Sequence, residues 1–113
     1  MPSFERGTVV RVPFPYTDRP VRQHRPALVV GLPGAADAPS LVWVLMITSA
    51  ENRRWTDDVD ADPGDPMTGL PVPSVIRVRK IATVETGRAE AIGKISAATL
   101  ARVMTEVRRA LDA

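Results

Sequence analysis

Two side chains at the ends of apolar segments have the types and the spacing for phosphate chemistry. Arg25 precedes the run PALVVGL, and Thr48 closes the run LVWVLMIT. If these runs form neighbouring antiparallel strands, the start of one lies beside the end of the other, and the two side chains share a corner. A guanidinium binds two phosphate oxygens, and a hydroxyl donates to one of them. Either residue alone is more typical of an ordinary strand end, so the hypothesis depends on the pair.

RNA suits such a corner because it carries its own nucleophile, the 2′-OH beside each phosphate. A protein that cleaves RNA by this internal attack orients the phosphate, stabilises the developing charge and manages two protons. The reaction requires neither a metal ion nor a covalent bond to the protein. The sequence therefore predicts no cofactor and no metal site for this chemistry.

Further side chains can bind a polyanion. Basic residues cluster around and after the proposed corner: Arg19, Arg22, His24, Arg53, Arg77, Arg79 and Lys80. Trp55 is equally consistent with stacking on a base and with capping the core. His24 is more typical of a surface contact than of a catalyst. Because charges of this kind also simply solvate a surface, composition alone does not decide for RNA.

Composition and motifs exclude several classes of site. The 113 residues contain no cysteine and one histidine, which excludes disulfides and a two-histidine acid–base pair within one chain. Phosphate-binding glycine loops and the GxSxG elbow are absent. The five aspartates between residues 57 and 65 lack EF-hand spacing, so we expect a solvated loop there. No apolar run approaches the ~20 residues of a membrane span, and we expect a soluble, cytoplasmic protein.

The hydrophobic pattern predicts short strands followed by one helix. The segment RGTVVRVPFPYT alternates like a half-buried strand, whereas residues 41–48 are apolar on both faces, as in a covered central strand. Further strands are expected over 26–32, 73–84 and 86–95, with a polar loop at 16–24 and a long excursion with one short edge strand between 55 and 70.

A helix is expected to follow from the N-cap Ser96. Its apolar stripe consists of Leu100, Val103, Met104, Val107 and Leu111. The order of elements predicts one domain over residues 1–113, a mainly β fold in which the C-terminal helix covers a small β-barrel.

The order RGTVVRVPFPYTD, RPALVVG, VLMITSAE, LPVPSVIRVRKIATVE and IGKIS, before an amphipathic helix, resembles the PemK/MazF family of toxin–antitoxin ribonucleases. The resemblance covers nearly the whole chain from Gly7. It implies an SH3-like β-barrel and a homodimer that cleaves single-stranded RNA sequence-selectively without metal. It also implies 2′,3′-cyclic phosphate and 5′-OH ends, and a cognate antitoxin that blocks the RNA groove.

The resemblance assigns the family's catalytic arginine and threonine to Arg25 and Thr48. We expect them first to stabilise the phosphate and the transition state, with proton transfer by Arg25 second, because arginine holds its proton tightly. Ser49 is expected to assist near the phosphate. Many members carry an arginine in a segment that reads IAT here, with Ala82 at that place. The basic residues before it, Arg77 to Lys80, are expected to contact RNA instead.

Two alternatives stay open at this point. One is a CcdB-like toxin that binds DNA gyrase through its C-terminal segment; the apolar stripe of the expected helix argues against it. The other is a catalytically silent RNA-binding module on the same barrel, which the Ala82 departure favours.

The apolar strand 41–48 and the helix offer more apolar surface than so small a barrel covers, which also predicts a dimer interface.

Overall fold

The computed structural model describes residues 4–14, 23–34 and 40–112. Its elements follow the chain as β1 (Thr8–Phe14), β2 (Gln23–Gly31), β3 (Leu41–Ser49), β4 (Val59–Asp60), η1 (Pro66–Thr68), β5 (Ser74–Glu85), η2 (Thr86–Arg88), β6 (Glu90–Lys94) and α1 (Ala97–Leu111). Within these residues no helix is long and apolar enough to span a membrane.

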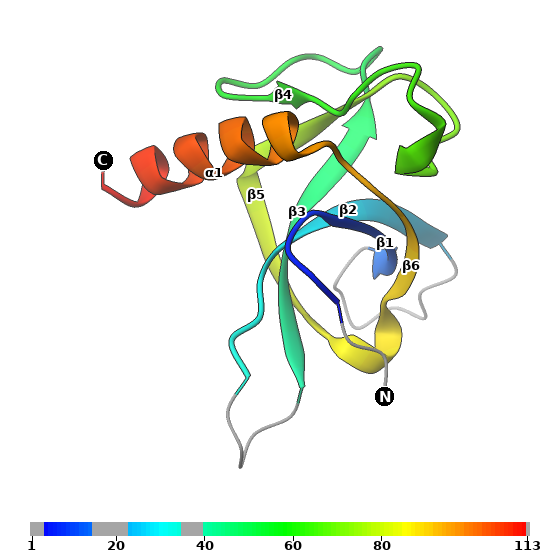
Figure 1. Ribbon diagram of the computed structural model, residues 1–113, viewed down its shortest axis with the longest axis vertical. Coiled ribbons are helices and arrows are strands. Elements are labelled where there is room, and N and C mark those ends of the chain that lie inside the picture. Colours follow the sequence, from blue (N-terminus) through cyan, green and yellow to red (C-terminus); the bar gives the residue numbers. More distant parts are fainter. Residues whose placement is uncertain (1–3, 15–22, 35–39, 113) are drawn as a thin grey trace.

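The strands form one antiparallel sheet in the order β4-β5-β3-β2-β1-β6. Figure 1 shows the sheet curling on itself, with α1 lying across one end beside β4. This arrangement confirms the predicted mainly β fold with a C-terminal helix. The excursion between 55 and 70 contains β4 as its short edge strand, as predicted. The predicted loop at 16–24 lies outside the described residues as far as residue 22, and it is wrong at its end, because β2 already begins at Gln23.

The core lies on both faces of the sheet because successive side chains of a strand point in opposite directions. In β3, Val42, Val44 and Met46 belong to one buried cluster, and Leu45 and Ile47 belong to the other. The prediction of a strand covered on both faces is therefore confirmed over this part of β3.

The prediction of a half-buried first strand is confirmed over residues 10–13, where Val10 and Val12 are buried and Arg11 is exposed, and it is wrong at Val9. Val9 and Val10 of β1 are both fully buried and lie in different clusters. Val9 is buried because it packs in the cluster that also contains Leu28 and Val103. Arg11, which lies between buried Val10 and Val12, reaches solvent.

A large irregularity bends β5 against β3. Ile47 pairs with Ile76 and Leu45 pairs with Ile81, so residues 77–80 of β5 lie opposite Met46 alone. Extra residues on one strand increase its local bend and twist and redirect its side chains. The basic segment predicted to contact RNA coincides with this bend.

The C-terminal helix begins as predicted. The Ser96 hydroxyl accepts a hydrogen bond from the Thr99 backbone N–H at 3.2 Å, and Val103 and Met104 are buried. The predicted stripe is wrong at its last position, since Leu111 is 79% exposed. Figure 1 shows the reason: the C-terminal end of α1 projects past β5 and has no sheet beneath it.

Candidate active site

Arg25 and Thr48 lie at one corner of the sheet. The antiparallel register of β2 and β3 pairs Ala27 with Met46, and continuing it by two residues places Arg25 opposite Thr48. Both side chains line a cavity of about 230 Å³. Its other lining residues are Met46, Ile47, Asn52, Arg77 and Lys80. Three positively charged residues therefore surround one hydroxyl, a combination suited to an anion.

A larger cavity of about 440 Å³ adjoins the same corner. Arg25, Ile47 and Thr48 belong to both cavities, so the corner stands between them. The wall of the larger cavity is completed by Arg11, His24, Pro26, Ser49, Gly69, Pro71, Val72, Ser74 and Ile92. Among the predicted residues, His24 and Ser49 thus lie on this side of the corner, and Arg77 and Lys80 lie on the other.

The Thr48 hydroxyl has a partner that sequence reasoning missed. The Nδ2 group of Asn52 donates to Thr48 Oγ1 at 2.6 Å. A turn after β3 brings the two together, because the Asn52 backbone N–H donates to the Ser49 carbonyl at 3.1 Å. The only signal in the sequence is a polar residue four positions after Thr48, which many turns would also supply.

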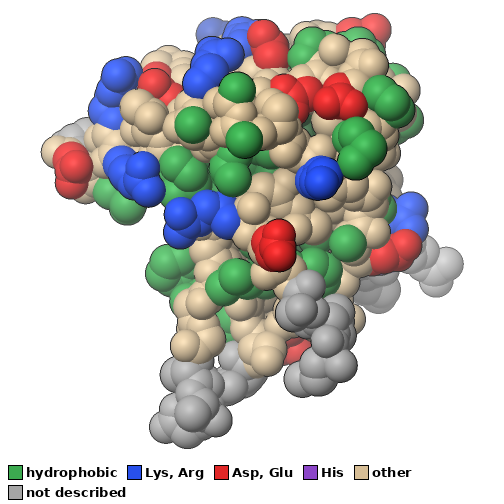
Figure 2. Space-filling model, in the orientation of Figure 1, with side chains coloured by type: hydrophobic (Ala, Val, Ile, Leu, Met, Phe, Trp, Pro, Cys, Tyr) green, Lys and Arg blue, Asp and Glu red, His purple; other side chains and the backbone are tan. Residues whose placement is uncertain are grey.

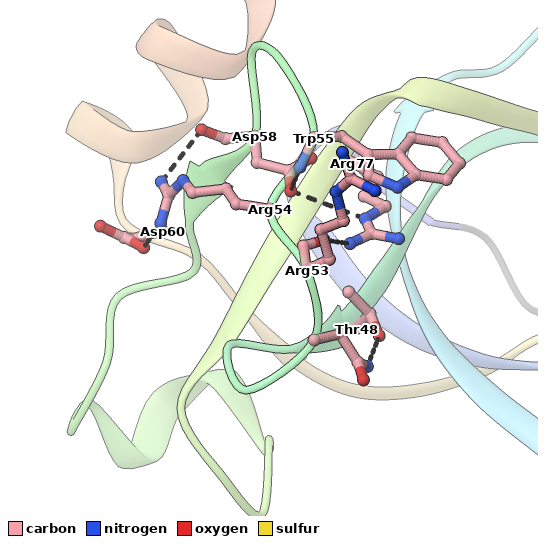
Figure 3. A network of polar contacts seen from close by, with 8 residues as sticks. Thr48, Arg53, Arg54, Trp55, Asp58, Asp60 and Arg77 are labelled. Atoms are coloured by element: carbon pink, nitrogen blue, oxygen red, sulfur yellow. Dashed lines mark hydrogen bonds and ion pairs between the residues drawn. The ribbon is translucent and has the colours of Figure 1, made fainter.

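Arg77 is the most enclosed of the basic residues at the site, and only 11% of its side chain is exposed. Figure 3 shows it among residues of the loop after β3. Its Nε lies 3.6 Å from Oδ2 of Asp58, its Nη2 donates to the Arg53 carbonyl, and its Cζ lies 4.3 Å from the centroid of the Trp55 ring. The same Asp58 oxygen accepts from the Trp55 backbone N–H at 2.9 Å. Arg77 therefore anchors the loop and lines the cavity at once.

The other predicted contacts lie outside both cavity walls. Trp55 is 42% exposed and rests on Arg77, so it neither caps a buried cluster nor presents both ring faces. Arg79 donates to Asp57 through Nε and Nη2 at 3.1 and 3.0 Å, and Arg53 is exposed. Arg19 and Arg22 lie outside the described residues.

The aspartate segment is not the solvated loop that we expected. Each of its carboxylates has a partner: Asp57 pairs with Arg79, Asp58 with Arg77, Asp60 with Arg54, Asp62 with Ser96 and Thr99, and Asp65 with the Met67 backbone. The difference arises because positive side chains and N–H and O–H groups of the fold lie within reach of these carboxylates, although Asp60 and its partner Arg54 stay exposed. Within the described ranges, no group of three or more His, Cys, Asp or Glu residues is arranged to hold a metal ion.

Asp62 connects this segment to the start of α1. Its carboxylate accepts from the Ser96 backbone N–H at 2.6 Å, from the Ser96 hydroxyl at 3.1 Å and from the Thr99 hydroxyl. Burial alone raises the pKa of Asp62, but these hydrogen bonds outweigh burial and lower that pKa below its ordinary value.

Comparison with solved structures finds the same fold. A MazE–MazF complex from Deinococcus radiodurans is 22% identical, with a TM-score of 0.67 over 95% of this chain and 93% of that chain. An endoribonuclease in complex with its cognate antitoxin from a mycobacterial species is 21% identical, with a TM-score of 0.72 over 97% and 96%. The Mycobacterium tuberculosis toxin MazF-mt6 is 20% identical, with a TM-score of 0.65 over 91% and 95%.

A comparison with curated protein sequences finds no significant match. The model of one family, however, described as the PemK-like, MazF-like toxin of type II toxin–antitoxin systems, matches residues 5–111. This range includes every described strand, the Arg25–Thr48 corner and α1. The chain therefore belongs to the PemK/MazF family of type II toxin–antitoxin toxins, as its sequence predicted.

Proposed function

We propose that this protein is an endoribonuclease toxin that cleaves single-stranded RNA, mRNA above all, at the Arg25–Thr48 corner without a metal ion. The observation that carries the proposal is the shared cavity wall, which Arg25, Lys80 and Arg77 line together with Thr48. A phosphodiester is the anion that uses both the guanidinium fork and the hydroxyl. Family membership supports the same reaction class.

In the proposed reaction the 2′-oxygen of the substrate bonds to phosphorus while the bond to the 5′-oxygen breaks. The 2′-OH gives up its proton to water and the departing 5′-oxygen takes one up, so the products are a 2′,3′-cyclic phosphate and a 5′-OH end. Arg25 binds the non-bridging oxygens and stabilises the charge that grows on them, and the Thr48 hydroxyl donates to one of them. Proton delivery to the leaving oxygen is a second role for Arg25, limited by the tightness with which arginine holds its proton.

The two cavities provide places for the nucleotides that flank the scissile phosphate. The smaller cavity presents Lys80 to the neighbouring phosphate. The larger cavity, of about 440 Å³, combines apolar walls such as Val72 and Ile92 with the polar groups of Ser49 and His24. Apolar walls with a few directed polar groups are typical of sites that select a planar ligand, so this cavity is our candidate for sequence selectivity.

Two protein partners belong to the proposal. A cognate antitoxin would cover the RNA site, as suggested by the related MazE–MazF complex and by the mycobacterial endoribonuclease bound to its antitoxin. A second copy of the chain would cover exposed apolar side chains on and beside the sheet, namely Trp43, Ile81 and Leu32 just after β2, which are 45%, 57% and 51% exposed. Figure 2 shows hydrophobic side chains gathered below α1 on one face. An mRNA substrate places the activity in the cytoplasm.

Cleavage of defined RNAs in EDTA by the purified protein, freed of antitoxin, tests the proposal. We expect cleavage with 2′,3′-cyclic phosphate and 5′-OH ends, and losses of about 100-fold or more for Arg25→Ala and Thr48→Ala at an unchanged thermal midpoint. Arg54→Ala is the matched control, since Arg54 pairs with Asp60 in solvent and lines neither cavity. Wild-type protein that cuts no RNA across varied sequences would refute the proposal. Inhibition of gyrase supercoiling by such a protein would favour the CcdB-like alternative.

A further inference from the structure

The hydrogen bond between Asn52 and Thr48 limits what the Thr48 hydroxyl can do. A hydroxyl has one hydrogen to donate and two lone pairs that accept. Asn52 Nδ2 approaches Thr48 Oγ1 to 2.6 Å and occupies one lone pair. The hydrogen of Thr48 cannot point toward a donor, so it is directed away from Asn52. Within the described part of the chain no hydrogen bond donated by Thr48 is present, so this hydrogen is available to a ligand in the cavity.

The backbone holds the Asn52 side chain in place for this contact. The Asn52 N–H donates to the Ser49 carbonyl at 3.1 Å, and the Glu51 N–H donates to the Ser49 hydroxyl at 3.2 Å. The Ala50 N–H is bonded to the Pro73 carbonyl at 2.9 Å, which ties the turn to the chain just before β5. These hydrogen bonds to Ser49 and to Pro73 hold the turn in place. Asn52 is exposed at this turn and lines the same 230 Å³ cavity as Thr48.

We propose that Asn52 is a positioning residue that orients the Thr48 hydroxyl hydrogen toward the bound phosphodiester. The inference rests on the proposed ribonuclease function. Without Asn52, the hydroxyl can rotate among its staggered positions, and fewer molecules present the hydrogen to the substrate. An accepted hydrogen bond also polarises the O–H group, which makes Thr48 a stronger donor to an anion. In this role Asn52 acts through Thr48.

A double-mutant cycle on RNA cleavage tests this dependence. Wild type, Asn52→Ala, Thr48→Ala and the double variant are compared for kcat and KM on one RNA. We expect Asn52→Ala to lower kcat about 3- to 10-fold with KM within about 2-fold, and to have no further effect when Thr48 is already alanine. Asn52→Gln, which keeps the amide, is expected to recover part of the loss. Glu51→Ala in the same turn is the control and is expected to match wild type.

Three outcomes overturn the inference while the proposed function stands. The first is a wild-type kcat in Asn52→Ala. The second is a loss of kcat on Asn52→Ala that is the same whether residue 48 is threonine or alanine. The third is a loss of kcat in Glu51→Ala as large as the loss in Asn52→Ala. In each case wild-type cleavage and its loss in Thr48→Ala still support the ribonuclease. An inactive wild type would instead refute the function itself.

Nuclear magnetic resonance tests the contact without any activity. The side-chain NH₂ signals of Asn52 are identified by their disappearance in Asn52→Ala. In Thr48→Val, which keeps the shape and removes the hydroxyl, we expect these signals to shift and their hydrogen exchange to accelerate, while backbone signals of the turn stay in place. Unchanged NH₂ signals would show that the hydrogen bond does not form in solution and would overturn the inference.

Discussion

The ion pair between Asp58 and Arg77 makes a strong prediction about stability. Asp58→Ala removes a carboxylate whose side chain is 1% exposed and leaves Arg77, at 11%, without its counter-charge. Breaking a buried pair from one side costs about 3–5 kcal/mol. The loss here lies near the lower end, at about 3 kcal/mol, because Arg77 keeps its bond to the Arg53 carbonyl and its contact with Trp55. The 3.6 Å separation of Arg77 Nε and Asp58 Oδ2 also weakens the pair.

The same loop offers a matched control. Asp60 pairs with Arg54 at 3.1 Å, but these side chains are 54% and 55% exposed. An exposed pair contributes about 0–1 kcal/mol, so Asp60→Ala is expected to leave stability almost unchanged. Both variants remove one aspartate of an ion pair from the same segment, and they differ in burial and in the hydrogen bond that Asp58 accepts from the Trp55 backbone.

Urea unfolding followed by circular dichroism at one protein concentration measures both losses. Asp58→Asn keeps an acceptor for the Trp55 N–H and is expected to fall between the two alanine variants. The double variant Asp58→Leu with Arg77→Met is expected to lose less than the sum of its single changes, because neither charge is then left alone. Equal losses for Asp58→Ala and Asp60→Ala would refute the reasoning.

Three further predictions concern charge and close packing. Asp62→Asn is expected to lower the free energy of unfolding most above about pH 4 and less as the pH falls. The reason is that a carboxylate with a lowered pKa stabilises the fold only while it is ionised. A loss that is independent of pH in urea unfolding would contradict this. Lys80→Ala is expected to weaken RNA binding and to reduce the slope of log affinity against log salt by about 0.7, the value for one phosphate contact with a single strand; an unchanged slope would exclude a phosphate contact. Gly93→Ala is expected to destabilise the fold by about 1–3 kcal/mol, because the new Cβ would collide with the Thr68 carbonyl group. Gly87→Ala is the control, because a Cβ at Gly87 meets no atom within 4 Å. Equal thermal midpoints for the two variants would contradict the close approach.

More of the fold than of the candidate site could be predicted from the sequence. The continuous apolar run around Leu45 predicted a strand covered on both faces, and Ser96 predicted the start of α1. Both predictions were possible because each signal comes from residues close together in the chain. Arg25 and Thr48 were proposed as a corner from an assumed antiparallel pairing, and the register of β2 and β3 places them opposite each other. Their chemical roles stay predictions.

Other features of the structure depend on contacts between residues far apart in the chain, which no local sequence pattern predicts. The exposure of Leu111 depends on where the sheet ends beneath α1, and helical spacing alone cannot show that end. The irregularity opposite Met46 depends on pairing between β3 and β5, which are separated by the whole aspartate segment. The contact from Asn52 to Thr48 requires the turn to fold back, which composition does not specify.

By itself, the sequence determined the order of strands and helix, the family, and which residues have the chemistry to hold a phosphate. Only the tertiary structure decided where these charges lie: Arg25 and Lys80 line the cavity, Arg77 lines it too but shares its charge with buried Asp58, and Arg79 faces Asp57. The physical reason is that the type and period of side chains are properties of neighbours in the chain. The burial and pairing of a charge are properties of neighbours in space.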